Sequence, residues 1–235
     1  MERKNRLSIR TAAMPAAVCI LMPATLFLCF GLGEKHYRLA SVLILVLTML
    51  PFFFLFEHRR PQARKLVVLA VMCALSVASR VAFSMLDFFK PTTAIIMIAG
   101  IAFGTEEGFL TGAVSALVSN LFFGQGPWTP WQMFAYGVAG FLAGLLIRNG
   151  RIPKKPLPMA IFGGVSVLMI VGPLLDTCSV FTMLSHITPK AVFSVYSAGL
   201  PINAIHAACT FVTLLLIGRP LLDKLERVQR KYGME

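Results

Sequence analysis

Apolar residues are gathered into eight runs that short polar segments separate. The runs lie roughly at 9–31, 39–56, 65–86, 92–103, 107–123, 131–148, 158–180 and 192–217. Most are long enough to cross the ~30 Å hydrocarbon layer of a membrane, which takes about 20 helical residues. The pattern therefore predicts an all-α polytopic membrane protein.

The fourth run, TTAIIMIAGIAF, is too short to span a membrane. As a helix it would reach only about 18 Å, because each residue adds 1.5 Å. We therefore expect a short helix that its neighbours shield or that lines a cavity.

A cluster of charged residues from Glu57 to Lys65 divides the chain in two. We predict an N-terminal transmembrane hairpin at 1–62 and a six-helix core at 63–235. An alternative interpretation of the first run is a signal peptide, because basic residues precede it. Its length and the second run that follows at once favour a membrane span.

The charge pattern indicates orientation. The chain is 57% hydrophobic and 14% charged, with a net charge of +12. If both termini face the cytoplasm, most of the 22 basic residues fall in inner segments, as the positive-inside rule requires. We therefore predict cytoplasmic N- and C-termini. A nucleic-acid partner is not expected, because the basic residues sit between membrane spans.

The sequence lacks the common motifs of catalysis. It has no nucleotide-binding GxxxxGK[ST] loop, no GxSxG, no HExxH and no dinucleotide fingerprint. Its five cysteines lie inside apolar runs, and its four histidines are far apart. We expect no enzyme activity, no metal centre and no bound cofactor.

The segment NLFFGQGPWTPWQM, residues 120–133, is an uncharged loop between two apolar runs. Its glycines and prolines predict a fixed, irregular backbone, which suits a binding site. We expect Thr129, Pro130 and Gln132 to open the next helix as N-cap, N1 and N3, with Gln132 completing a capping box. Trp128 and Trp131 fit either interfacial anchoring or stacking on a flat ligand.

Other polar side chains lie within the apolar runs. Arg80 falls inside the third run, where an ionisable group usually faces an interior or a cavity. It could hold a ligand, pair with Asp87 or Asp176, or extend to the membrane surface. Asn203 and His206 share one face of the last run, either for a ligand or for contacts between helices.

Ala70, Ala74 and Ala78 form a narrow stripe of small residues on the third run. Such stripes let two membrane helices approach closely. The partner helix could belong to this chain or to another protein. Arg80, about 200° around the helix from Ala78, points away from the stripe.

The segment from Ala78 to Leu146 resembles the substrate-specific S components of bacterial energy-coupling factor (ECF) vitamin transporters. The resemblance rests on KPTTAI, GTEEGFLTGA and FFGQGPWTPWQM, and it extends over the six-span part of the chain. The most specific motif lies at Gly124 to Gln132.

The resemblance implies a six-helix protein of the bacterial plasma membrane that binds a micronutrient at its outer face. It further implies a transmembrane T subunit and two cytoplasmic ATPases as partners. Ala70, Ala74 and Ala78 then become expected contacts with the T subunit, and the missing nucleotide motif is accounted for. The QGPWTPWQ loop is similar to that of the cobalamin or corrinoid subgroup, with riboflavin and other flat vitamins still open.

The sequence therefore predicts a substrate-binding pocket near the outer face. Its predicted residues are Arg80, Asn120, Gln125, Trp128, Gln132, Asn203 and His206. Two other functions are compatible with the sequence: an ion-coupled secondary carrier, which would transport without ATPases, and an intramembrane enzyme acting on a lipid or isoprenoid.

Overall fold

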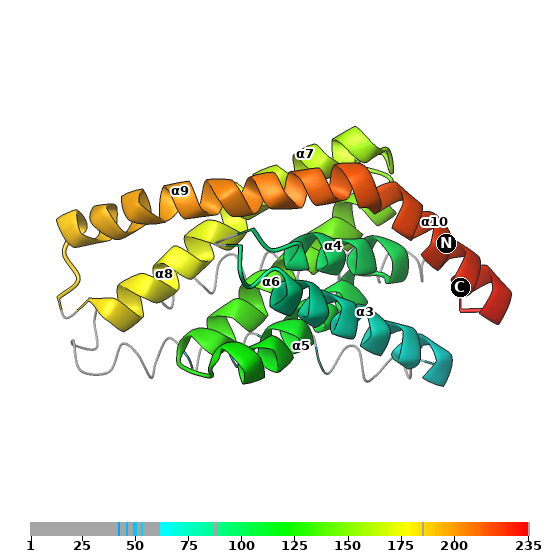
Figure 1. Cartoon of the computed structure of the whole chain (residues 1–235), viewed down its shortest axis with the longest axis horizontal. Helices are drawn as coiled ribbons and strands as arrows, with labels where there is room; N and C mark the ends of the chain where they lie inside the picture. Colours follow the sequence, from blue (N-terminus) through cyan, green and yellow to red (C-terminus); the bar gives the residue numbers. More distant parts are fainter. Residues whose placement is uncertain are drawn as a thin grey trace, which may run out of the picture.

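The computed structural model describes residues 42, 46, 49, 50, 53, 62–86, 89–184 and 186–234. Residues 62–234 of this part form six continuous helices (Figure 1). Their segments are α3 (Ala63–Ala82), α4 (Thr92–Phe103), α5 (Thr105–Phe123), α6 (Trp128–Ala143) with η2 (Gly144–Arg148), α7 (Pro156–Ser166) with η3 (Val167–Val171) and α8 (Gly172–Met183), and α9 (Pro189–Thr213) with η4 (Leu214–Gly218) and α10 (Arg219–Tyr232). The η segments are single π-helical turns within longer helices.

The prediction of an all-α protein is confirmed for the described residues. Each of the last six apolar runs lies in its own helix. Within the described part of the chain, four helices are long and apolar enough to cross a membrane: Ala63–Ala82, Trp128–Arg148, Pro156–Met183 and Pro189–Tyr232. The predicted hairpin at 1–62 lies outside the described residues, apart from Gln62 and five isolated positions.

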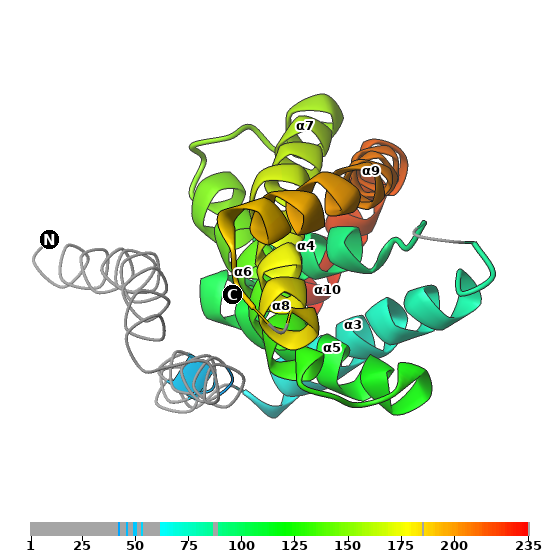
Figure 2. The same cartoon turned by 90° about the vertical axis from the view of Figure 1, so that its left-hand side faces the viewer.

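The short helix α4 is the centre of the bundle. It contacts α3, α5, α6 and α9, and all of its residues are buried. Figure 2 shows it surrounded by the other helices. The expectation that neighbours shield this helix is therefore confirmed, and the shielding explains how a helix too short to span the membrane is accommodated.

Glycines allow α4, α5 and α6 to touch backbone to backbone. A Cβ atom on Gly100 would lie 2.1 Å from the carbonyl oxygen of Gly140, and one on Gly108 would lie 2.5 Å from the same atom. Any larger residue at these positions would force the helices apart. At the junction of α4 and α5, Gly104 has a φ of 134°, which L-residues rarely adopt.

The last helix is one continuous rod of 44 residues, of which α9, in gold and orange, lies along the long axis of Figure 1 and α10, in red, bends away from that axis. It runs through Pro201 without ending there, so the last span begins at Pro189, ahead of that proline. Gly163 in α7 faces Leu214 and Thr210 of this rod. The rod continues into the polar helix α10, of which Leu222 and Leu225 are buried.

Two isolated residues of the N-terminal region contact the core. Met49 is buried, and the ring of Phe53 lies edge-on to Phe109 of α5 with 6.5 Å between centroids. Phe109 in turn packs edge-on against Phe134 of α6. At these two described positions the N-terminal region therefore packs on the α5–α6 pair.

Candidate ligand-binding site

Arg80 is a buried cation held by α5. Its Nη1 group donates to Ser119 Oγ and to Asn120 Oδ1, the latter at 2.9 Å. Its guanidinium also lies 4.9 Å from the centre of the Phe123 ring, where a cation–π contact is favourable. The side chain is only 7% exposed, and the alanine stripe on the opposite face of α3 is exposed. The predicted direction of Arg80, away from the stripe, is thus confirmed.

Arg80 makes no ion pair with any carboxylate among the described residues. Asp176, one of the two pairing candidates, instead accepts a hydrogen bond from Asn203, and Asp87 lies outside the described residues. Arg80 Nε is buried and makes no hydrogen bond to the part of the chain described here. Burying a cation is costly unless polar groups or an electron-rich partner compensate, so this donor makes Arg80 a candidate ligand-binding residue.

Asn120 connects Arg80 to the loop between α5 and α6. While its oxygen accepts from Arg80, its Nδ2 group donates to Gln132 Oε1 at 2.8 Å and to Thr129 Oγ1 at 3.1 Å. Asn120 is almost completely buried. All of its strong hydrogen-bonding capacity is used within the protein, which makes it a positioning group for Arg80 and Gln132.

Thr129 organises the loop itself. Its hydroxyl accepts from the backbone N–H of Gly126 at 3.2 Å and donates to Gln125 Oε1 at 2.8 Å. Gln125 Nε2 donates to the carbonyl of Leu117 at 3.0 Å, which ties the loop back to α5. Gly124, with a φ of 94°, gives the turn that brings these groups together.

The predicted capping box is wrong. Helix α6 begins at Trp128, its N-cap position is Pro127, and no side chain caps it. Gln132 binds the side chain of Asn120 in α5 and does not reach back to Thr129. Gln132 therefore pairs with a residue twelve positions earlier in the chain, and the predicted contact with the start of its own helix is not made.

The two tryptophans have different environments. Trp128 is 42% exposed, and its ring lies over Gly126, where a Cβ atom would come within 2.5 Å of it. Trp131 is buried and stacks on Phe181 of α8, with 6.0 Å between ring centres. Of the two tryptophans, Trp128 is therefore the one that a molecule outside the core can reach.

Positive charge gathers near Arg80. Lys90 Nζ lies 5.4 Å from the centre of the same Phe123 ring, and His206 of α9 lies within electrostatic range of both Lys90 and Arg80. Ser76 Oγ donates to the carbonyl of Thr92 at 3.5 Å, which fixes the start of α4 beside α3. The site is thus an electropositive region at the N-terminal end of α4.

Asn203 is not part of this network. Its Nδ2 group donates to Asp176 Oδ2 at 2.7 Å, between α8 and α9. Gly172 and Gly199 leave room for the pair, since a Cβ atom on either would clash with it. The structure therefore brings Arg80, Asn120, Gln125 and Gln132 into one network with His206 nearby, and it places Asn203 with Asp176.

Sequence reasoning missed Ser119, Thr129 and Phe123 as parts of the site. All three bind or contact predicted residues directly. Ser119 and Phe123 lie on α5 one residue before and three residues after Asn120, so the helical repeat around Asn120 was the signal that could have identified them.

Comparison with known proteins gives a family match. Residues 61–227 match the family described as "ECF-type riboflavin transporter, S component". Two curated relatives are a UPF0397 protein of Vibrio atlanticus, 33% identical over 85 residues, and one of Aliivibrio fischeri, 31% identical over 87 residues. The alignments cover 35% and 32% of this chain and 46% and 47% of the relatives.

The chain thus spans about half the length of the curated relatives it matches. No solved structure matches it. The expected cobalamin or corrinoid subgroup is not supported, because the matching family is described by riboflavin.

Proposed function

This chain belongs to the family of S components of ECF-type riboflavin transporters, and from that premise we propose that it is the substrate-binding membrane subunit of an ECF importer for riboflavin or a related flavin. The family is one of transport proteins, so the interpretation as an intramembrane enzyme is dropped. Riboflavin replaces cobalamin as the first cargo to test.

The observation that carries the proposal is the buried network around Arg80. A flavin ring is flat and has one polar edge that carries carbonyl oxygens and an N–H group. Arg80 offers an Nε donor with no hydrogen-bond partner among the described residues, and the amide of Gln132 has an Nε2 group with no hydrogen bond to those residues. Donors of this kind suit carbonyl oxygens in a site shielded from water.

Each proposed pocket residue has a distinct role. Arg80 and Gln132 donate to the polar edge of the cargo, and Trp128 stacks on its flat face. His206 adds a polar group from α9. Asn120 and Gln125 position these groups through the contacts described above. Asn203 holds α8 against α9 and acts on the pocket only through that packing.

The partners follow from the same proposal. The T subunit docks on the exposed alanine stripe of α3, Ala70, Ala74 and Ala78, because small residues allow close helix approach. Two cytoplasmic ATPases supply the energy. The termini are cytoplasmic, so the loop at 124–127 faces outward and α10 faces inward.

Riboflavin fluorescence tests the cargo. The purified full chain should quench riboflavin fluorescence in a saturable titration, with cobalamin and thiamine giving no competition. Trp128→Ala should weaken binding, since it removes the stacking ring. Saturable binding of cobalamin without flavin binding would reject riboflavin as cargo.

Reconstituted vesicles test the transport mode. We expect uptake only when the T subunit and the ATPases are present. Accumulation of riboflavin by this chain alone, driven by an ion gradient, would instead establish a secondary carrier.

A further inference from the structure

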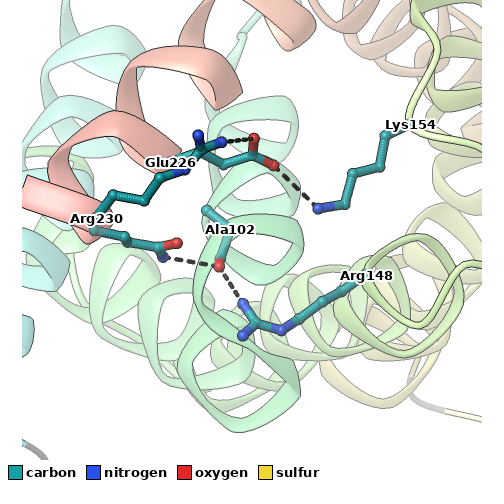
Figure 3. Close-up of a pocket in the computed structure, with 6 residues that line it drawn as sticks. Ala102, Arg148, Lys154, Glu226 and Arg230 are labelled. Carbon is teal, nitrogen blue, oxygen red and sulfur yellow. Dashed lines mark hydrogen bonds and ion pairs between the residues drawn. The ribbon is translucent and has the colours of Figure 1, made fainter. Parts of the chain in front are cut away.

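A polar cavity lies at the end of α4 that is opposite Arg80. It has a volume of about 390 Å³ and is lined by Ala102, Arg148, Lys154, Glu226, Gln229 and Arg230. In Figure 3, Arg148 and Lys154 approach from one side, and Glu226 and Arg230 of α10 approach from the other. This cavity is separate from the proposed flavin site and does not depend on it.

Two of the side chains that line the cavity donate hydrogen bonds to the backbone carbonyl of Ala102. It lies in the last turn of α4, where helix carbonyls lack partners within the helix. Arg148 Nη1 and Gln229 Nε2 both donate to it, the latter at 2.9 Å. A cation at a helix C-terminus is also favoured by the helix dipole. One guanidinium nitrogen of Arg148 therefore has a structural role.

The charges in the cavity do not balance. Lys154 Nζ lies 3.1 Å from Glu226 Oε1, and Arg230 Nη2 lies 3.8 Å from Glu226 Oε2. One carboxylate thus serves two cations. Arg148 forms no ion pair with any carboxylate in the described part of the chain. Three cations and one carboxylate line the cavity, which leaves an excess of two positive charges.

The surroundings place the cavity at a membrane surface. The helix Trp128–Arg148 ends here, and the helix Pro156–Met183 starts just after the loop. Arg151 and Lys155 in that loop are exposed. The buried Leu222 and Leu225 hold the polar helix α10 against the end of the bundle. Basic residues at this depth face the phosphate groups of lipid headgroups.

We propose that this cavity binds a phosphate group, supplied by the headgroup of an anionic phospholipid. Arg148 and Lys154 would donate charge-assisted hydrogen bonds to the phosphate oxygens, while Glu226 keeps Lys154 and Arg230 in place. A free inorganic phosphate shares this chemistry and is the other source to distinguish. Bound lipid would hold α10 to the ends of α4 and α6.

The test measures lipid binding to the purified full chain in detergent. Native mass spectrometry titrates phosphatidylglycerol against phosphatidylcholine, and a parallel titration uses inorganic phosphate. We expect phosphatidylglycerol to bind more tightly than phosphatidylcholine. Arg148→Gln should weaken phosphatidylglycerol binding about tenfold, because one charge-assisted hydrogen bond is lost. The matched control Arg151→Gln, an exposed arginine of the loop that follows Arg148, should leave it unchanged.

The variant Glu226→Gln tests whether a change in lipid binding comes from the charge of the cavity or from a damaged fold. It removes the one carboxylate among the described residues that line the cavity, so phosphatidylglycerol should bind several-fold more tightly, an effect that a damaged fold does not produce. Inorganic phosphate that competes at equal affinity would identify free phosphate as the source. Equal binding of the two lipids without phosphate binding, or equal effects of Arg148→Gln and Arg151→Gln, would overturn the proposal.

Discussion

The two ends of α4 hold cations in opposite ways. At the loop end, Arg80 is buried among a serine, an amide and an aromatic ring. At the α10 end, Arg148 and Arg230 reach water, and two cations share Glu226. A desolvated cation interacts strongly and selects the geometry of its partner, whereas exposed cations attract anions weakly and in a salt-dependent way. Under the two proposals made above, the same residue type recognises a specific cargo at one end and a common headgroup at the other.

The largest expected effect is at the buried end. Arg80→Gln should weaken flavin binding about a hundredfold, because a charged donor to the cargo is lost and Asn120 loses the partner that orients it. Fluorescence titration measures the dissociation constant. Lys155→Gln, which removes an exposed cation near the opposite end, is the control. Equal affinities in both variants would remove Arg80 from the pocket.

The next effect concerns α3, the helix that carries Arg80 on its buried face. Ala74→Leu should reduce co-purification of the T subunit about tenfold, since the added atoms prevent close approach of its helix. Flavin affinity should stay near that of the wild type, because the stripe points away from Arg80. Ala204→Leu on the exposed face of α9 is the matched control. Unchanged assembly of the Ala74→Leu variant would exclude the stripe as the docking surface.

A smaller effect is expected in the loop that positions the cargo-binding groups. Thr129→Val keeps the shape but removes the hydroxyl that binds Gly126, Asn120 and Gln125. Flavin binding should weaken several-fold to about tenfold, which corresponds to about 1–1.4 kcal/mol. Thr129→Ser, which retains the hydroxyl, should bind nearly as well as the wild type. If valine and serine behave alike, the loop hydrogen bonds do not shape the pocket.

The smallest effect is at the exposed end. Gln229→Leu removes one of the two donors to the carbonyl of Ala102, and Arg148 still serves that atom. The melting temperature should fall by about 2–4 °C, which corresponds to about 1 kcal/mol. Gln62→Leu, at an exposed glutamine with no capping bond, controls for the change of residue type. A fall of similar size in both variants would show that Gln229 does not cap α4.

The helices could be predicted because a membrane imposes their length and composition. Even the short helix at 92–103 was identifiable, since a run too brief to span must be enclosed by protein. The helices that pack against it could not be identified from the sequence. Glycines at 100, 104, 108 and 112 recur every four residues, but only the folded chain shows that Gly140 lies against two of them.

Part of the site could also be predicted, because the membrane makes polar residues within apolar runs conspicuous. Arg80 and the loop residues stand out as polar groups among apolar ones, and they meet in space. Local rules failed where a distant group was the better partner. Gln132 binds Asn120 in place of the helix start, and Asn203 turns to Asp176 on the neighbouring helix. The hydrogen-bond partner of each side chain depends on which helices are adjacent, and a single sequence does not reveal that arrangement.

The unbroken rod from Pro189 to Tyr232 has a mechanical consequence. Its 44 residues extend over about 66 Å, roughly twice the thickness of the hydrocarbon layer. A lever of that length turns a rotation of about 10° into a displacement of about 11 Å at its tip. A small reorientation at the start of α9 would therefore sweep the basic tail across a distance comparable to the width of a helix.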